Sequence, residues 1–224
     1  DEKGKMLTGG TPESVVALLE GLHIDALGIN CSLGPRQIKP FVERMIQVSS
    51  TPIIVTPNAG LPQTDDEGHT YYDMNADEFA SEMKEIASLN VHVLGGCCGT
   101  TPEYLSKTIE LVKDLPIEPP VKKNMSVVTS FSQAVEIGPK PVIIGERINP
   151  TGKKKFKQAL RDGDINYILS EGLKQEDAGA HILDVNVGLP EIDEPKMMVE
   201  VMKKLQSVIA LPLQIDTSDP IALE

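Results

Sequence analysis

The chain contains three cysteines, and all three follow apolar runs and stand among glycines. Cys31 lies in GINCSLGP, whereas Cys97 and Cys98 are adjacent in GGCCGTTPE. Neighbouring residues of a regular strand point to opposite faces, so Cys97 and Cys98 can share a target only where a strand ends. If the apolar runs are strands of one parallel sheet, all three sulfurs can converge at one rim. Three thiolates with one open position suit a catalytic zinc ion, and the open position suits a thiol substrate.

Simpler roles for the three thiols are compatible with the same pattern. Free cysteine packs as a small hydrophobe, so all three could be buried and inert. A disulfide between the adjacent Cys97 and Cys98 would close a strained small ring and is disfavoured. No strand-end cysteine has a histidine beside it, the four histidines being His23, His69, His92 and His181. His92 lies within an apolar run, and we expect it to be packed or solvated rather than a fourth metal ligand.

A second group of polar residues follows apolar runs in the C-terminal part of the chain. The motifs IGERINPTG, ILDVNVG and LQIDTSDP place polar groups at Glu146, Arg147, Asn149, Asp184, Asn186, Asp216 and Thr217. Asp, Asn and Thr also cap helices, so any one of these residues has a structural explanation. Three successive strand ends with such groups are more than capping requires. Their donors and acceptors suit the edge of an amide-rich heterocycle.

Apolar runs alternate with helical patterns along the chain, and these elements must position the motifs. Runs typical of buried strands occupy residues 25–31, 52–57, 91–97, 142–148, 182–187 and 211–217. Helical spacing covers residues 15–22, 38–46, 79–87 and 101–112, a stretch that ends near 173, and a segment that begins near 194. Strands that alternate with helices over short connections predict βαβ units and parallel sheets. Such sheets carry their chemistry at the carboxyl ends of the strands.

The alternation is interrupted between residues 116 and 140. PIEPPVKKN is rich in proline and charge, which is typical of linkers, and SVVTSFSQAVEI is compatible with a short pair of strands. We therefore divide the chain into residues 1–115, a linker at 116–140, and residues 141–224. A closed (β/α)8 barrel takes roughly 250 residues, more than either block provides. The expected fold class is α/β, with parts of two (β/α)8 TIM-type barrels joined by a linker, each incomplete in this chain.

The composition argues against several classes of protein. The net charge of −12 disfavours nucleic acid or an anionic membrane as a partner. No apolar run reaches the ~20 residues of a membrane span. Three cysteines do not fit a secreted disulfide framework, so we expect the reducing cytoplasm. The chain opens without methionine and closes on DTSDPIALE, the start of a helix, so we expect a fragment of a longer protein.

The cysteine motifs resemble those of a known family. GINCSLGP and GGCCGTTPE are similar to the zinc-binding signatures of the homocysteine methyltransferases, and TPNAGLP resembles a strand end of the same family. The resemblance implies that Cys31, Cys97 and Cys98 bind zinc and that zinc activates homocysteine. It covers about residues 1–115, which correspond to the C-terminal half of that family's barrel.

The later motifs resemble the pterin-binding barrels of dihydropteroate synthases and of folate- or corrinoid-dependent methyltransferases. This resemblance implies that a pterin is hydrogen-bonded by Asn149, Asp184, Asn186 and Asp216. Glu146 and Arg147 belong to the same motif, without an assigned role. The resemblance runs from about residue 141 to residue 224, the N-terminal half of the barrel.

The order of the two blocks is similar to that in cobalamin-dependent methionine synthases. It implies methyl transfer from methyltetrahydrofolate through cobalamin to zinc-bound homocysteine, giving methionine and tetrahydrofolate. Zinc is then a cofactor of this chain, whereas methylcobalamin belongs to a cobalamin-binding module elsewhere in the parent chain. We expect the fragment alone to lack turnover and to need its missing halves, or another copy, to fold stably. The alternatives are a cobalamin-independent homocysteine or thiol S-methyltransferase and a zinc-stabilised, non-catalytic scaffold.

Overall fold

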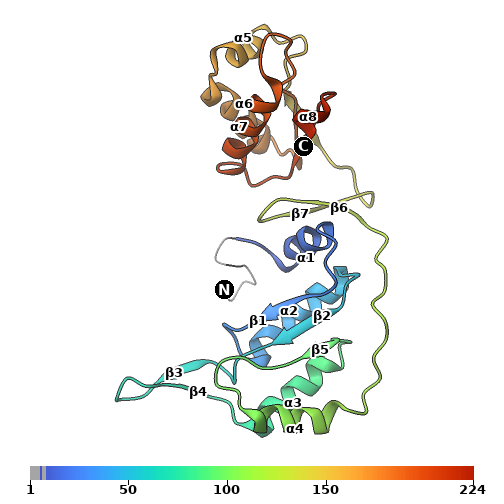
Figure 1. Ribbon diagram of the computed structural model, residues 1–224, viewed down its shortest axis with the longest axis vertical. Helices are drawn as coiled ribbons and strands as arrows, with labels where there is room; N and C mark the ends of the chain where they lie inside the picture. Colours follow the sequence, from blue (N-terminus) through green and yellow to red (C-terminus); the bar gives the residue numbers. More distant parts are fainter. Residues whose placement is uncertain (1–5, 7–8) are drawn as a thin grey trace. The chain divides into compact units, whose positions relative to one another are not determined.

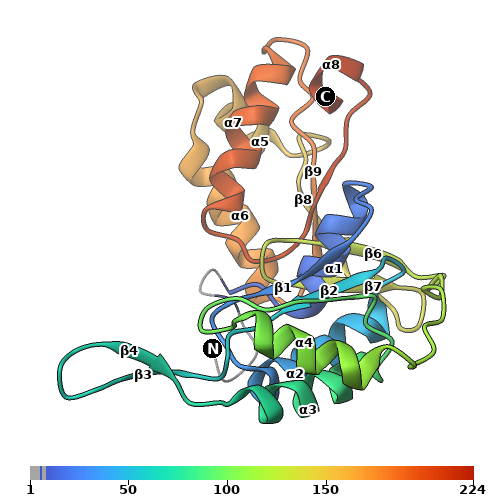
Figure 2. The same cartoon turned by 60° about the horizontal axis from the view of Figure 1, so that its bottom comes forward.

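The computed structural model describes Met6 and residues 9–224, and it divides into two compact units (Figures 1 and 2). The first unit contains Val15–Asn124, and the second contains Met125–Glu224 together with a short stretch that ends at Ser14. Each unit has its own hydrophobic core. The division after Asn124 falls inside the region that the sequence suggests as a linker.

A three-stranded parallel sheet forms the centre of the first unit. Its strands are β1 (Leu27–Asn30), β2 (Ile53–Thr56) and β5 (Val93–Leu94), in the order β1-β2-β5. The sheet is open, and β2 is its central strand. Because all three strands run in the same direction, the loops that follow them meet at one edge.

Helices alternate with these strands, as the sequence predicts. They are α1 (Pro12–Gly21), α2 (Pro35–Val48), α3 (Ala76–Ala87) and α4 (Pro102–Val112). The expected apolar face of α2 is confirmed, because Ile38, Val42 and Met45 are buried. Phe79 and Met83 of α3 are fully buried and belong to the same core.

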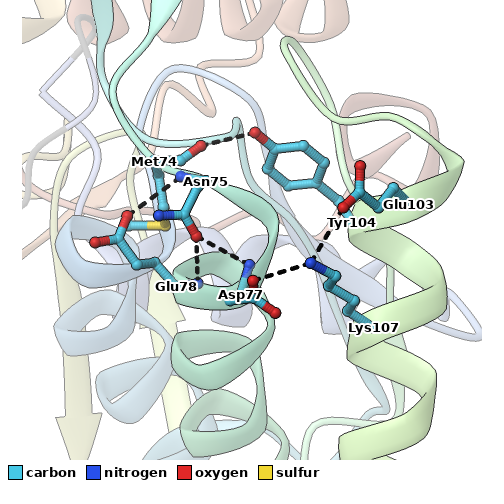
Figure 3. A network of polar contacts seen from close by, with 7 residues as sticks. All are labelled: Met74, Asn75, Asp77, Glu78, Glu103, Tyr104 and Lys107. Carbon is cyan, nitrogen blue, oxygen red and sulfur yellow. Dashed lines mark hydrogen bonds and ion pairs between the residues drawn. The ribbon is translucent and has the colours of Figure 1, made fainter.

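The start of α3 is defined by its own side chains (Figure 3). The Asn75 side chain accepts hydrogen bonds from the backbone N–H groups of Asp77 and Glu78. The Glu78 carboxylate in turn accepts a hydrogen bond from the Asn75 backbone N–H at 3.2 Å. This reciprocal capping box satisfies N–H groups that have no partner within the helix.

Helix α4 packs against α3 through one aromatic residue and one ion pair. The Tyr104 ring meets Phe79 edge-on at 5.5 Å, and its hydroxyl donates a hydrogen bond to the backbone oxygen of Met74 at 2.8 Å. Lys107 lies 2.9 Å from a carboxylate oxygen of Asp77 (Figure 3). These contacts fix the helix that follows the paired cysteines.

Part of the apolar surface of α4 is uncovered. Leu105 is 37% exposed and Ile109 is 57% exposed. Thr108, by contrast, is the residue of α4 that is buried. The sheet beside these helices is also open, so further strands could pair with its edges and further helices could pack on this apolar surface.

A β-hairpin that the sequence does not indicate lies between β2 and α3. Its strands β3 (Pro62–Thr64) and β4 (Thr70–Tyr72) are antiparallel, with Gln63 opposite Tyr71. The hairpin extends away from the parallel sheet (Figures 1 and 2). Its strands are three residues long and mostly exposed, so the alternation of apolar and polar residues that marks a strand is absent.

The region between the two expected blocks contains side-chain hydrogen bonds to the first block and a pair of short strands. The Asn90 side chain forms two hydrogen bonds with the backbone of Glu118, at 2.8 and 2.9 Å. Farther along, β6 (Ser126–Thr129) and β7 (Ala134–Ile137) form an antiparallel pair. The strand pair expected from the sequence is therefore confirmed.

The second unit repeats the parallel arrangement. Its sheet has the order β10-β9-β8 and consists of β8 (Ile144–Ile148), β9 (Ile182–Val185) and β10 (Leu213–Ile215). Its helices are α5 (Lys154–Asp162), α6 (Ile165–Asp177), α7 (Glu194–Gln206) and the single turn α8 (Pro220–Leu223). The parallel α/β class expected from the sequence is confirmed for both units, and neither parallel sheet closes into a barrel within the described residues.

The helical stretch expected to run to residue 173 is two helices rather than one. Gly163 ends α5 with a left-handed backbone, at a φ of 66°. Asp164 then caps α6, because its side chain accepts a hydrogen bond from the backbone N–H of Tyr167. A glycine after one helix and an aspartate before the next are standard stop and start signals.

Candidate functional sites at the strand ends

The structure brings the three cysteine sulfurs together at the carboxyl edge of the first sheet. Cys31 directly follows β1, whereas Cys97 and Cys98 follow β5 after two glycines. The Sγ atom of Cys98 lies 3.6 Å from that of Cys31 and 3.9 Å from that of Cys97. Cys31 and Cys97 are half-buried and Cys98 is exposed, which argues against three buried, inert thiols.

The end of β2 holds both cysteine loops in place. The Thr56 backbone oxygen accepts a hydrogen bond from Cys31 N–H at 3.0 Å, and the Pro57 oxygen accepts one from Cys97 N–H at 2.7 Å. Cys31 and the next residue, Ser32, both have a φ of 63°. Two successive non-glycine residues in this sparsely populated conformation store local strain, and such strain clusters at functional sites.

Asn58 connects the two arms of the cluster. Its side chain is buried, and its Oδ1 atom accepts a hydrogen bond from Cys98 N–H at 3.2 Å. Its backbone N–H donates to the Leu33 oxygen at 3.0 Å. The sequence indicates this position only as part of a strand end, because the contacts join residues far apart in the chain.

Tyr72 of the unexpected hairpin also reaches the cluster. Hydrogen bonding to Cys98, and then partial burial, raise the pKa of the Tyr72 hydroxyl. The ring lies directly against Gly99, where an added Cβ would come within 2.3 Å of ring atom Cδ2. Nothing in the sequence points to Tyr72, since the hairpin that carries it has no apolar pattern.

The three thiols are not equivalent in acidity. The hydrogen bond from the Ser32 backbone N–H, followed by those from the other two thiols, lowers the pKa of Cys31. The pKa of Cys97 is raised, chiefly by its hydrogen bond with Cys31 and then by partial burial. Cys31 therefore loses its proton more readily than Cys97.

The donor set fits a metal ion. The three sulfurs lie within 4.8 Å of one another. In a tetrahedral zinc site with Zn–S bonds of ~2.3 Å, sulfurs stand about 3.8 Å apart, close to the observed 3.6 and 3.9 Å. His92 lies before β5 and has its ring 3.1 Å from the Glu118 backbone oxygen, as expected for a residue outside the cluster.

In the second unit, two of the expected residues contact each other directly. The Asn186 side chain donates a hydrogen bond to Asp216 at 2.9 Å, and its oxygen accepts one from Gly188 N–H at 2.9 Å. Asn186 N–H also donates to the backbone oxygen of Ile148 at 2.8 Å. The ends of β8, β9 and β10 are thereby brought into one polar group.

The other expected residues lie at the same strand ends, but each forms its hydrogen bond or ion pair with a different neighbour. Asp184 accepts a hydrogen bond from the Gln214 side chain at 2.9 Å. Asn149 is buried and accepts a hydrogen bond from Thr151 N–H at 2.8 Å, which is the turn role considered from the sequence. The remaining side chains interact locally, with Lys153 3.2 Å from Glu146 and Thr217 donating to Glu194.

The ionised form of Asp184 destabilises the folded second unit. Burial, and then the nearby charges of Asp216 and Glu146, raise its pKa. A carboxyl whose pKa is raised on folding destabilises the folded state once it is ionised in both states. Below its unfolded pKa, about 3.9, it is protonated in both states and has no such effect.

We therefore expect Asp184→Asn to raise the denaturation midpoint of the second unit at pH 7. Asparagine keeps an oxygen that can accept the Gln214 hydrogen bond while the buried charge is removed. The gain should shrink as the pH falls toward about 4, as measured by urea unfolding at several pH values. Asp162→Asn, at an exposed position on α5, is the control. A gain that grows on acidification would contradict the argument.

Comparison with known families covers both units in succession. The family model for homocysteine S-methyltransferases matches residues 1–112, half of the chain. The chain belongs to the homocysteine S-methyltransferase family. A second model, for pterin-binding enzymes, matches residues 145–224. This order is the arrangement found in the N-terminal region of methionine synthase.

Each of the two matches contains one of the two groups of side chains. The cysteine cluster lies within the first match, and the polar strand ends lie within the second. Among solved structures, a variant of pyruvate carboxylase from Rhizobium etli aligns with 96% of the chain at 13% identity and a TM-score of 0.27. The chain spans 20% of that enzyme's length, and so distant a likeness carries no argument.

None of the helices formed by Met6 and residues 9–224 combines the length and apolar character that a membrane span requires.

Proposed function

We propose that the chain is part of a cobalamin-dependent methionine synthase, with a zinc site for homocysteine in the first unit and a pterin site in the second. One observation carries the proposal. Three sulfurs lie at zinc-site separations within a homocysteine S-methyltransferase match, and a pterin-binding match follows in the same chain. The open sheets and the exposed apolar residues of α4 support the further proposal that both units are incomplete barrels.

Cys31, Cys97 and Cys98 would hold the zinc ion, leaving one position for the homocysteine sulfur. Zinc lowers the pKa of a coordinated thiol and so makes it a nucleophile at neutral pH. Asn58 orients the cluster, because its side chain is bonded to the Cys98 backbone and its own backbone N–H to Leu33 in the Cys31 loop. The partial exposure of the sulfurs leaves them accessible to a substrate.

In the second unit, Asn149, Asp184, Asn186 and Asp216 would bind the pterin of methyltetrahydrofolate. The Asn186–Asp216 hydrogen bond preorganises one donor and one acceptor at the strand ends. We propose that the methyl group passes from this folate to homocysteine by way of cobalamin held by a separate module. Three unpaired thiols suit a reducing compartment, so we place the protein in the cytoplasm.

Binding of a thiol to the zinc-loaded chain tests this proposal. Homocysteine should release about one proton per zinc, because a coordinated thiol is deprotonated. Homoserine, which has a hydroxyl in place of the thiol, should release none. Proton release is measured by calorimetry in buffers of different ionisation enthalpy.

The outcomes separate the proposed function from its alternatives. Zinc bound without thiol-dependent proton release would indicate a non-catalytic, zinc-stabilised scaffold. Proton release without binding of methyltetrahydrofolate, titrated into the same sample, would favour a cobalamin-independent thiol methyltransferase. Binding of both ligands supports the proposal.

A further inference from the structure

The β3–β4 hairpin brings an aromatic residue to the cysteine cluster from outside the parallel sheet. Tyr72 is the last residue of β4, and its ring lies against Gly99, the residue directly after Cys98. Cys98 is the exposed member of the three cysteines, and its sulfur lies 3.6 Å from that of Cys31 and 3.9 Å from that of Cys97. A side chain placed beside Cys98 therefore adjoins the most accessible part of the site.

The backbone around the hairpin is shaped to place this ring. Gly99, directly after Cys98, has a φ of 80°, and a Cβ there would lie 2.3 Å from Tyr72 Cδ2 and 2.6 Å from its Cγ. Ring and glycine are therefore in close contact, and any side chain at residue 99 would displace the tyrosine. The tyrosine side chain thus lies against the turn that carries the paired cysteines.

A second close contact at a glycine, together with two hydrogen bonds, holds the base of the hairpin. A Cβ at Gly60 would lie 2.1 Å from Asp73 Oδ1, which accepts a hydrogen bond from Leu61 N–H at 2.8 Å. Met74 N–H donates to the Ala59 oxygen at 3.1 Å. Both ends of the hairpin are thus joined beside Asn58, so the position of Tyr72 is coupled to the cluster by backbone contacts.

We propose that Tyr72 is a positioning residue of the metal–thiol site, whose hydroxyl donates a hydrogen bond to the Cys98 thiolate and whose ring covers one side of the cluster. This inference rests on the proposed zinc function of the cysteines. A hydrogen bond to a ligating sulfur fixes its orientation and stabilises its negative charge. The ring limits the direction from which a thiol substrate can approach.

A purely structural role for Tyr72 makes a different prediction. If the residue only fills space over Gly99, phenylalanine should replace it without effect on metal binding. If the hydroxyl supports the thiolate, Tyr72→Phe should weaken zinc binding while the ring contact and the fold are kept. The hairpin offers a matched control in Tyr71→Phe, because Tyr71 is the adjacent residue of β4 and is 51% exposed.

The test compares the full chain with these two variants. Zinc affinity is measured by competition with a chromophoric chelator, and the sulfur-to-metal charge-transfer band is recorded after substitution with Co²⁺. Tyr72→Phe should weaken zinc binding by about 10-fold, within the range for loss of a partner of a metal ligand, and should shift the band. Tyr71→Phe should change neither quantity.

Two results would overturn the inference in distinguishable ways. A Tyr72→Phe variant equal to the wild-type chain in both measurements would overturn the role of Tyr72 and leave the zinc function intact. A wild-type chain that binds neither zinc nor Co²⁺ would overturn both proposals together. A loss of affinity in Tyr72→Phe with an unchanged thermal unfolding midpoint supports the role of the hydroxyl.

Discussion

Replacing Cys98 by serine is expected to weaken zinc binding by more than about 100-fold, since loss of a mere supporting partner already costs 10–100-fold. Serine is close to cysteine in size and polar, so the loop can keep its course. Its hydroxyl stays neutral at pH 7, however, and it lacks the soft sulfur that zinc prefers in such a site. The Cys98 sulfur also lies within 3.9 Å of both other sulfurs.

Zinc per chain after dialysis, measured by mass spectrometry, checks this expectation. Cys31→Ser should cause the same loss, although Cys31 is 67 residues away in the sequence. Asp216→Asn, in the second unit, should retain zinc. Retention of zinc in either cysteine variant would show that the three sulfurs do not form one site.

Gly28→Ala is expected to destabilise the first unit by about 4 kcal/mol or more, which is the range of severe overpacking and backbone displacement. An added Cβ would lie 1.9 Å from the backbone oxygen of Ile54 and 2.8 Å from its Cβ. Ile54 is on β2, which pairs with strands on both sides and so cannot move without disturbing the whole sheet. Loss of zinc should follow, because Cys31 comes directly after β1.

Denaturant unfolding monitored by hydrogen exchange can assign this loss to the first unit. The matched control is Gly21→Ala, at the end of α1, where an added Cβ meets nothing within 4 Å. That variant should be neutral or gain up to about 1 kcal/mol from the better helix propensity of alanine. Equal stability of the two variants would show that the β1–β2 contact is not tightly constrained.

Much of the arrangement followed from local patterns in the sequence. The alternation of strands and helices predicted parallel sheets, and the carboxyl ends of parallel strands meet at one edge. The pattern therefore predicted that Cys31, Cys97 and Cys98 share one edge of a sheet and that Asn186 and Asp216 share another. Period and spacing are local properties, so they are readable from the chain.

The break between α5 and α6 shows the limit of such patterns. Apolar spacing continued across residues 163 and 164, which concealed the boundary between the helices. Gly163 and Asp164 are themselves stop and start signals, so this boundary was readable from the sequence in principle. The hairpin β3–β4 had no comparable signal, because its short strands are stabilised by their mutual pairing rather than by burial.

The sequence by itself determined the parallel α/β class, because strand ends are encoded locally. It also offered the candidate metal ligands and, through a family resemblance, the candidate pterin-binding residues. Only the tertiary structure decided which side chains support them. Asn58 and Tyr72 reach the cysteine loops through contacts between segments far apart in the chain. The sequence indicated Asn58 only as part of a strand end, and it gave no signal for Tyr72. The strength of a metal site depends on such supporting contacts as well as on its ligands, so the candidate ligands were readable from the sequence and the side chains around them were not.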